Sequence, residues 1–296
     1  MSVRFNHFRN PKKIINQYVQ PLVTYFKIHK LINYWQQKLD YKLLPILLYH
    51  SVGGTTLSKF NMSSEAFEQQ IEFISKKFRI VRLSEIGQKL NETSAGSSHE
   101  GYCVITFDDA YQNIIKNVHP IMVKYQAPYT IFVPTDFIGS MTNWIQVPER
   151  VLSDEELKAL HKSKLVDYGS HMASHQNTEG IDEDMLMLEA QKSKRVLEQL
   201  LAIESIIMFS YPYGGIHDYS KKTINLLRES GYKIAVTTRF SAMNSAKDMM
   251  MLRRIQLDES DSLKTIHEKL LGYYDWFLIK EYLTFLVRKI FSIPVR

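Results

Sequence analysis

The stretch VITFDD, residues 104–109, places two carboxylates directly after a run of apolar and β-branched residues. Such a run predicts a buried strand that ends at Asp108. Because successive side chains leave a strand in opposite directions, Asp108 and Asp109 are expected to face different partners, one a metal ion and the other a substrate. An Asp-Asp pair taken alone is more often a solvated turn or a helix cap.

Short apolar runs recur along the chain and alternate with amphipathic segments. The runs that predict strands cover residues 46–49, 102–107, 129–133, 166–169, 206–209, 234–236 and 252–255. Helical spacing of apolar residues predicts a helix over 67–78, and a capping box at Ser153 and Glu156 predicts the start of another. Two longer helices are predicted over 182–201 and 220–229. Seven strands interleaved with helices predict an α/β fold with a parallel, barrel-like sheet.

Two further segments follow predicted strands. Residues 169–175 read GSHMASH, and on a helical turn the spacing of His171 and His175 brings both imidazoles within reach of one ion. Residues 209–215 read FSYPYGG, a strand running into a turn that can aim a backbone N–H into a site. Each segment is weak by itself, but all three lie at carboxyl ends of strands, where parallel α/β folds place their sites.

In this order, Thr-Phe-Asp-Asp, His-x-x-x-His and Tyr-Pro-Tyr-Gly resemble the polysaccharide deacetylase family, also called the NodB-homology domain or carbohydrate esterase family 4. The resemblance runs from about residue 45 to residue 270, and it includes LLYHSV at 47–52, Gly231-Tyr232 and Arg254-Ile255. It implies a distorted (β/α)7 barrel and a divalent metal, most often zinc (Zn2+). It also implies a hydrolase that acts on an N-acetylated polysaccharide.

The resemblance also assigns roles to residues. It implies that Asp109, His171 and His175 bind the metal, that Asp108 is the general base and that the backbone N–H of Tyr213 stabilises the oxyanion. Two imidazoles and one carboxylate leave coordination positions open, as a catalytic metal site requires. Such an ion lowers the pKa of water toward roughly 7 and polarises the amide carbonyl, and Asp108 then accepts the proton of the water.

The leaving amine needs a general acid. Many relatives supply it from a Leu-x-His near the carboxyl terminus, where this chain has Leu252-Arg253-Arg254 without histidine. His50 ends the first predicted strand, and a barrel closes its first strand near its last, so His50 is the predicted acid. His217 and His267 are the alternatives.

Three other positions depart from the family pattern. Ala110 replaces a frequent Gly, Met172 replaces a frequent Ser or Thr, and Ser210 stands where many relatives have an Arg that orients the base. Asp108 therefore needs another partner, for which Arg254 is the candidate. In the long connection over 140–149, Trp144 is expected either to stack on a sugar ring or to pack under its own loop.

Composition limits the other possibilities. The lone Cys103 excludes an internal disulfide, so histidine and carboxylate must build any metal site. Residues 1–44 carry eight Lys/Arg against one acid and residues 271–296 carry four against two, so the ends hold +9 and the middle −3. Basic ends favour contact with an anionic membrane surface. No nucleic-acid-binding motif accompanies them, so no nucleic acid partner is predicted.

The predicted division is a basic amphipathic N-terminal extension (1–44), a polysaccharide deacetylase domain (45–270) and a basic amphipathic C-terminal helix (271–296). The apolar stripes of the two ends fit a helix packed on the domain as well as an in-plane membrane anchor. No secretory signal or membrane-spanning stretch is recognised. The expected location is cytoplasmic, or peripheral on the inner membrane face.

The leading functional hypothesis is a metal-dependent hydrolase that removes N-acetyl groups from hexosamine units of a cell-surface polysaccharide or its precursor. Two alternatives stay open. One is a weak or inactive carbohydrate-binding relative, which the missing Arg at position 210 favours and the intact acid pair disfavours. The other is a membrane-surface scaffold in polysaccharide assembly, which the charged ends suggest.

Overall fold

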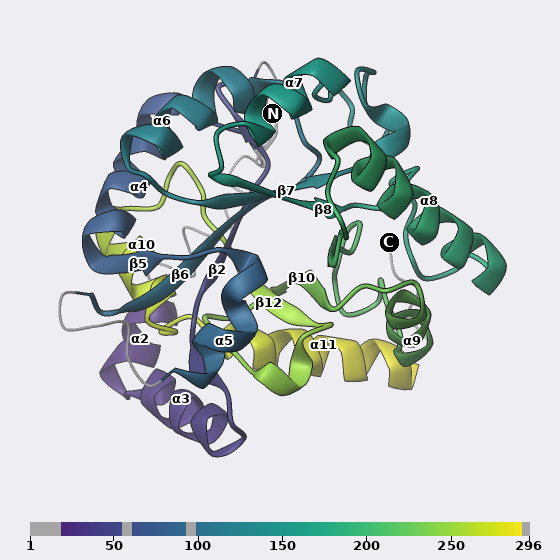
Figure 1. Cartoon of the computed structure of the whole chain (residues 1–296). Helices are drawn as coiled ribbons and strands as arrows, with labels where there is room; N and C mark the ends of the chain where they lie inside the picture. The colour runs from purple at the N-terminus through teal and green to yellow at the C-terminus, as the bar shows by residue number, and fades with distance from the viewer. Residues whose placement is uncertain (1–18, 55–60, 93–98, 292–296) are drawn as a thin grey trace, which may run out of the picture.

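Seven parallel strands close into a barrel in the computed structural model, which describes residues 19–54, 61–92 and 99–291 (Figure 1). The barrel strands are β2 (Ile46–Tyr49), β6 (Gly101–Phe107), β7 (Tyr129–Val133), β8 (Val166–Ser170), β9 (Met208–Ser210), β10 (Ile234–Phe240) and β12 (Leu252–Gln256). Their order is β2-β12-β10-β9-β8-β7-β6, and pairing of β2 with β6 closes the ring. The predicted distorted (β/α)7 barrel is confirmed.

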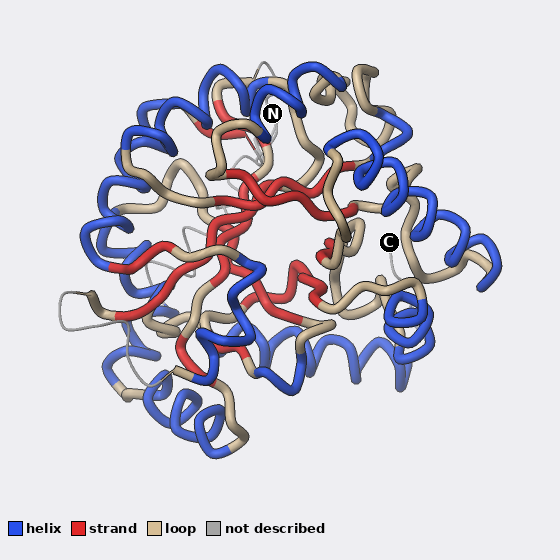
Figure 2. The backbone as a smooth tube through the Cα atoms, viewed as in Figure 1, coloured by secondary structure: helices blue, strands red, loops and turns tan. Residues whose placement is uncertain are grey.

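Helices surround the strands as an outer layer (Figure 2). They are α4 (Ser64–Lys77), α5 (Ile86–Asn91), α6 (His119–Lys124), α7 (Asp154–His161), α8 (Glu183–Leu201), α9 (Lys221–Glu229) and α10 (Leu263–Leu270). The capping box predicted at Ser153 and Glu156 is present at the start of α7. Among the described residues, no helix is long and apolar enough to cross a membrane.

Some boundaries and short elements differ from the predictions. Phe78 was predicted to end a helix, but it begins β5 (Phe78–Ile80), which pairs with the start of β6. Four two-residue strands form two pairs that were not predicted from the sequence. They are β1 (Lys42–Leu43) with β11 (Met243–Asn244), and β3 (Ser51–Val52) with β4 (Asn61–Met62).

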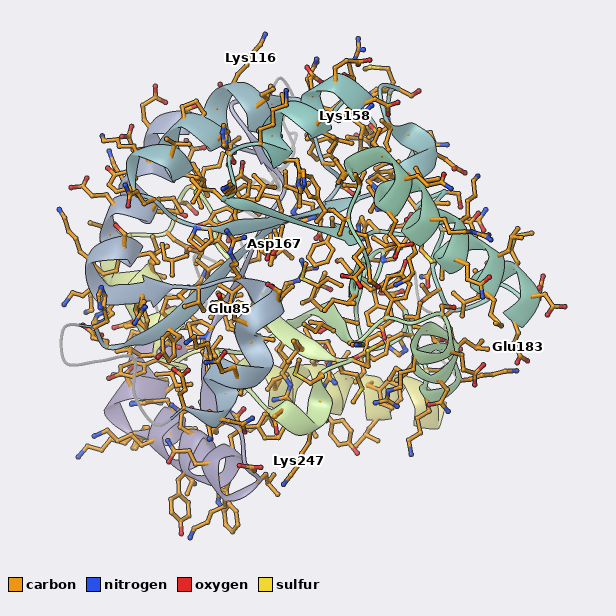
Figure 3. All side chains as sticks on the ribbon, viewed as in Figure 1. Glu85, Lys116, Lys158, Asp167, Glu183 and Lys247 are labelled. Atoms are coloured by element: carbon orange, nitrogen blue, oxygen red, sulfur yellow. The ribbon has the colours of Figure 1, made fainter. Side chains whose placement is uncertain are left out.

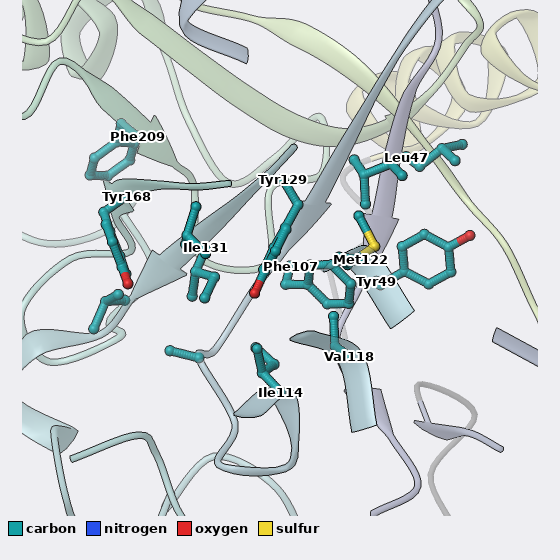
Figure 4. Close-up of a cluster of buried hydrophobic side chains, with 14 of the residues drawn as sticks. Leu47, Tyr49, Phe107, Ile114, Val118, Met122, Tyr129, Ile131, Tyr168 and Phe209 are labelled. Atoms are coloured by element: carbon teal, nitrogen blue, oxygen red, sulfur yellow. The ribbon is translucent and has the colours of Figure 1, made fainter. Parts of the chain in front are cut away.

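The strands are buried on both faces, as parallel barrel strands must be. Alternate residues of each strand join different clusters: Val104, Phe132 and Val236 belong to one, and their neighbours Ile105 and Ile131 to the other. The larger cluster contains the aromatic and aliphatic side chains shown in Figure 4. Charged side chains such as Lys116 and Lys247 point outward from the barrel (Figure 3).

The two ends of the described chain lie against each other. Helix α3 (Ile28–Lys38) packs beside α11 (Trp276–Phe291), and Gln36 Nε2 donates to Asp275 Oδ2 at 3.1 Å. Trp276 Nε1 donates to Gln20 Oε1 of α2 (Gln20–Tyr25) at 3.0 Å. Each predicted extension also contacts the domain, since Gln36 accepts from Arg253 and Asp275 accepts from Ala242 N, while the domain boundaries at 44 and 270 stay a prediction. Residues 1–18 of the first extension lie outside the described part.

Candidate active site and metal centre

The carboxyl ends of the barrel strands surround one pocket of about 380 Å³. All six residues predicted for the site line this pocket: His50, Asp108, Asp109, His171, His175 and Tyr213. They come from segments that follow β2, β6, β8 and β9. The barrel brings them together because the carboxyl ends of parallel strands share one face.

Asp109 and the two histidines form a cluster that can hold a metal ion. Asp109 Oδ1 lies 3.5 Å from His171 Nε2 and 3.2 Å from His175 Nε2. The three ligand atoms lie within 4.8 Å of one another, and all three residues are buried. Asp109 Oδ1 is buried without a hydrogen bond of good geometry. A buried acceptor facing two imidazole nitrogens fits a divalent cation in the space between them.

The protonation states in this cluster suit a metal. Burial lowers the pKa of His171 to about 4, so its imidazole is neutral near neutral pH, as a ligand must be. Burial alone raises the pKa of Asp109, but His175 and the other imidazoles oppose this effect and hold that pKa well below its usual range. The carboxylate is therefore ionised at neutral pH.

Neighbouring groups fix the orientation of the histidines. His171 Nδ1 lies 2.8 Å from the carbonyl oxygen of Ser210, so Nδ1–H donates there and Nε2 keeps its lone pair toward Asp109. The Trp144 ring stacks on the His175 ring with centroids 4.0 Å apart and planes at 8°. Trp144 thus lines the pocket by packing on a predicted ligand.

The loop carrying the histidines is not helical, so the predicted helical turn is wrong. No helix or strand is assigned over residues 171–175, and Met172 and His175 adopt left-handed backbone angles with φ of 61° and 58°. The carboxylate of Glu189 accepts hydrogen bonds from Ser174 N and Ser174 Oγ, each 2.8 Å long. The imidazoles converge because the loop turns back on itself, and Glu189 on α8 secures that turn.

Asp108 belongs to a second, differently built cluster. The guanidinium of Arg254 donates to both its oxygens, with Nη1 2.8 Å from Oδ1 and Nη2 2.7 Å from Oδ2. Ser210 Oγ donates to Oδ2 at 3.2 Å, and Arg254, 1% exposed, also donates to Thr237 O. Burial raises the pKa of Asp108, but the charge and hydrogen bonds of Arg254 together with His171 and His50 outweigh burial and lower it. Arg254 is thus the partner expected in place of an Arg at position 210.

Left-handed backbone also concentrates at the other two segments of the site. Asp109, Ala110 and Tyr213 have φ of 67°, 50° and 63°. Non-glycine residues in this region are strained, and such strain persists where the surroundings enforce it. A Cβ on the adjacent Gly214 would lie 2.9 Å from Thr238 N, so only glycine fits there. The Tyr-Pro-Tyr-Gly turn is therefore held close to β10.

His50 and Tyr213 both line the pocket that contains the acid pair. The amide of Asp108 donates to the carbonyl of Tyr49 at 3.0 Å, which sets His50 beside the acid pair. Burial lowers the pKa of His50. His217 and His267, the alternative acids, do not line this pocket: His217 packs on Phe285, and His267 is hydrogen-bonded to Glu100.

Sequence reasoning missed other residues of the pocket. Tyr111 lies beside Asp109, and burial together with that charge raises the pKa of its phenol. Ser51 Oγ donates to Glu149 Oε2 at 3.0 Å, and Asn113 Nδ2 donates to the same oxygen at 3.1 Å. Glu149 ends the long connection predicted to border the site. No local pattern marked its side chain, because its partners come from distant segments.

Comparison with known proteins shows which family this chain resembles. The family model described as polysaccharide deacetylase matches residues 95–235. The Bacillus subtilis protein YxkH is 25% identical over 215 residues, which cover 72% of this chain and 71% of the relative. A poly-beta-1,6-N-acetyl-D-glucosamine N-deacetylase of Staphylococcus epidermidis is 23% identical over 229 residues, covering 75% and 76%.

Solved structures share the fold. The deacetylase PplD of Streptococcus pyogenes superposes with a TM-score of 0.65 at 22% identity, covering 77% of this chain and 97% of that one. IcaB from Ammonifex degensii superposes with a TM-score of 0.66 at 21% identity and the same coverage. The family model, the deacetylase relatives and the shared fold all agree in their likeness to polysaccharide deacetylases. The predicted resemblance to this family and the predicted hydrolase class are confirmed to this extent.

Proposed function

We propose that this chain hydrolyses N-acetyl groups of hexosamine units in a polysaccharide or its precursor. The observation that carries the proposal is the side-by-side arrangement of two buried clusters in one pocket. Asp109, His171 and His175 form a set that can hold a metal, and Asp108 beside them is kept ionised by Arg254. A carbohydrate-binding relative without turnover has no need of the second cluster.

The residues of the chain divide the work of the reaction. A divalent ion held by Asp109, His171 and His175 supplies Lewis acidity for the amide carbonyl and for the attacking water. Asp108 accepts a proton from that water, since Arg254 and Ser210 hold its carboxylate in place. The N–H of Tyr213 donates to the developing oxyanion. His50 donates a proton to the amine as the C–N bond breaks, which leaves acetate and a free amino group.

We further propose zinc as the ion. Two imidazole nitrogens and one carboxylate oxygen are the ligand types of catalytic zinc sites, and three protein ligands leave positions for water and substrate. Competition between zinc, manganese and calcium for the metal-stripped protein tests the choice. Zinc is expected to bind at least about tenfold more tightly than manganese, following the general affinity order. Stronger binding of manganese or calcium would discard zinc.

The substrate class follows from the chemistry and from the relatives. The Staphylococcus relatives are named as acting on poly-beta-1,6-N-acetyl-D-glucosamine, so oligomers of this sugar are the first to test. The stripped protein is reconstituted with zinc and mixed with the oligomers, and released acetate is measured. Turnover is expected from the reconstituted protein, and turnover by the Asp108→Asn variant is expected to be at least about 100-fold slower. Absence of turnover with several acetylated glycans and metals, while they still bind, would favour the carbohydrate-binding alternative.

We also propose that α2 and α3 touch the anionic inner leaflet of a membrane. Large apolar side chains on these helices face solvent, with Leu31 and Trp35 exposed by 59% and 60%. Lys27, Lys30 and Lys38 lie beside them, which suits an interfacial amphipathic surface. The test is sedimentation with vesicles of phosphatidylcholine and phosphatidylglycerol. Leu31→Asp with Trp35→Asp should abolish sedimentation, and equal sedimentation of this variant would exclude the surface.

The control for this surface is an apolar residue of similar exposure elsewhere. Leu188 on α8 is 55% exposed and lies on another helix. Leu188→Asp is expected to sediment like the unchanged protein. If both variants lose binding to the same degree, the loss reflects added negative charge and the α2 and α3 surface is rejected.

A further inference from the structure

A second pocket adjoins the catalytic one and extends to the C-terminal helix. It has a volume of about 540 Å³, and it shares Thr238 and Gln256 with the catalytic pocket. These two residues lie at the carboxyl ends of β10 and β12, so both pockets open on the same face of the barrel. Its far wall is α11, so we call it the α11 pocket.

The α11 pocket combines aromatic rings with hydrogen-bonding groups. Phe277 and Phe285 of α11 are partly exposed in it, and His217 packs against Phe285 with ring centroids 5.1 Å apart. Polar side chains surround these rings: Gln256, Asp258, Ser260, Lys280 and Thr284. A sugar ring presents C–H groups on its faces and hydroxyl groups around its edge, so it needs both kinds of wall.

The wall that α11 provides is fixed to the barrel. Asp275, directly before α11, accepts hydrogen bonds from Gln36 Nε2 and from Ala242 N at 3.1 Å and 2.9 Å. Arg239, which follows Thr238 on β10, donates to Glu281 of α11 at 2.9 Å. The pocket therefore has its shape before a ligand binds, which reduces the entropy lost on binding.

The other side of α11 offers a useful contrast. The groove between α3 and α11 is lined by Val23, Ile28, Ile32, Trp276, Ile279, Lys280, Leu283 and Thr284. It lacks the carboxylate and amide groups of the α11 pocket, so it suits an aliphatic chain rather than a sugar. The carboxylate and amide groups are thus confined to the side of the helix that adjoins the catalytic pocket, whereas Lys280 and Thr284 border both sides.

We propose that the α11 pocket binds the sugar units next to the one that is deacetylated. This inference rests on the proposed function, because it takes the substrate to be an oligomer of acetylated hexosamines. The C-terminal helix then forms part of the substrate site, and the protein prefers oligomers over the single sugar. Phe285 is a specificity residue, since its ring faces the second pocket and not the catalytic one.

The test compares two alanine variants of the same helix. Phe285→Ala removes a ring from the α11 pocket, whereas Leu283→Ala removes a side chain from the opposite groove. Acetate release is measured with N-acetylglucosamine and with its β-1,6-linked tetramer. Phe285→Ala should lower kcat/KM for the tetramer about tenfold, as expected for truncating an aromatic anchor, and leave the single sugar unchanged. Leu283→Ala should leave both unchanged.

Other outcomes overturn the proposal. An equal loss for the single sugar and the tetramer would mean that Phe285 supports the fold, and no loss would mean that the pocket is not used. A loss seen only with a lipid-linked sugar would assign the pocket to the lipid. If the unchanged protein releases no acetate at all, the deacetylase proposal fails separately. Calorimetric binding of the tetramer to the protein and to Phe285→Ala then still decides whether the pocket holds sugar.

Discussion

Asp108 and Asp109 are neighbours in the sequence, yet the barrel builds opposite surroundings for them. Both carboxylate oxygens of Asp108 accept hydrogen bonds from Arg254, and one of them also accepts a hydrogen bond from Ser210. Asp109 faces two imidazole nitrogens, and its Oδ1 lacks a well-directed hydrogen bond. The first cluster contains an arginine, whereas the second consists of aspartate and histidine side chains.

The difference shows how one strand end can serve two steps of a reaction. A carboxylate paired with a fixed guanidinium stays ionised and immobile, which suits a base that must receive a proton at one place. A buried carboxylate grouped with imidazole nitrogens, with no arginine or lysine paired to it, carries negative charge that a metal cation can neutralise. The two clusters should therefore fail in different ways when single residues are changed.

The largest effect is expected for Asp108→Asn. The amide keeps the shape but cannot accept the proton, so kcat should fall roughly 100- to 10,000-fold. Zinc content should stay that of the unchanged protein, because Asp108 is not in the metal cluster. Asp136→Asn, an exposed acid paired with Lys192, is the control and should keep full activity. Loss of zinc from Asp108→Asn would show that the clusters are not separable.

Arg254→Ala should mainly destabilise the fold. It leaves the buried carboxylate of Asp108 unpaired, and the free energy of unfolding at neutral pH should fall by about 3–5 kcal/mol. This loss of stability should become smaller at acid pH, where Asp108 is protonated in both the folded and the unfolded protein. The pKa of Asp108 rises without the guanidinium. Any remaining activity should therefore begin to fall at a higher pH, as the pH is lowered, than in the unchanged protein. Urea unfolding at several pH values checks this.

A matched change at the next position controls for the loss of an arginine. Arg253 stacks on Tyr41 and donates to Gln36, away from the catalytic pocket. Arg253→Ala should cost about 1 kcal/mol and leave the pH profile in place. Equal destabilisation by the two variants at every pH would contradict the role given to Arg254.

Glu189→Ala should weaken the metal cluster without touching Asp108. Its carboxylate secures Ser174, the residue before His175, so its removal loosens one ligand. Zinc affinity should fall roughly 10-fold, the lower end for residues that orient ligands. Competition with a chromogenic chelator measures it. Unchanged affinity would mean that the loop holds its shape without Glu189.

The smallest effect is expected for Ser210→Ala. The change removes one hydrogen bond to Asp108 and one from Arg254, while the Ser210 carbonyl that fixes His171 remains. Activity should drop about fivefold, equivalent to about 1 kcal/mol, with zinc affinity unchanged. A loss of more than 100-fold in kcat would mean that Ser210 takes part directly in proton transfer.

The sequence predicted the barrel well because most of its strands are short runs rich in apolar residues. All seven runs became barrel strands, and β2 and β7 have the predicted bounds. Strands of two residues, such as β3 and β4, are too short to show a period of two, so they were missed. Phe78 continued an apolar helical spacing, but it extends into β5 because pairing with β6 outweighs local spacing.

Motifs in the sequence predicted the site residues, whereas several of the residues that hold them in place were found only in the structure. Asp108, Asp109, His171 and His175 follow predicted strands, so their convergence follows from barrel topology. The non-helical path of the histidine loop includes two hydrogen bonds from Ser174 to Glu189 on the next helix, α8. The Ser51, Asn113 and Glu149 cluster likewise joins three separate segments. Spacing along the chain carries no information about such contacts.

The most direct test of the separation between the clusters is zinc binding by metal-stripped protein, measured by calorimetry. The unchanged protein and Asp108→Asn should each bind one zinc per chain with similar affinity. Asp109→Ala should bind zinc at least about 100-fold more weakly, because a direct ligand matters more than an orienting neighbour. Tight zinc binding by Asp109→Ala, equal to that of the unchanged protein, would contradict the account.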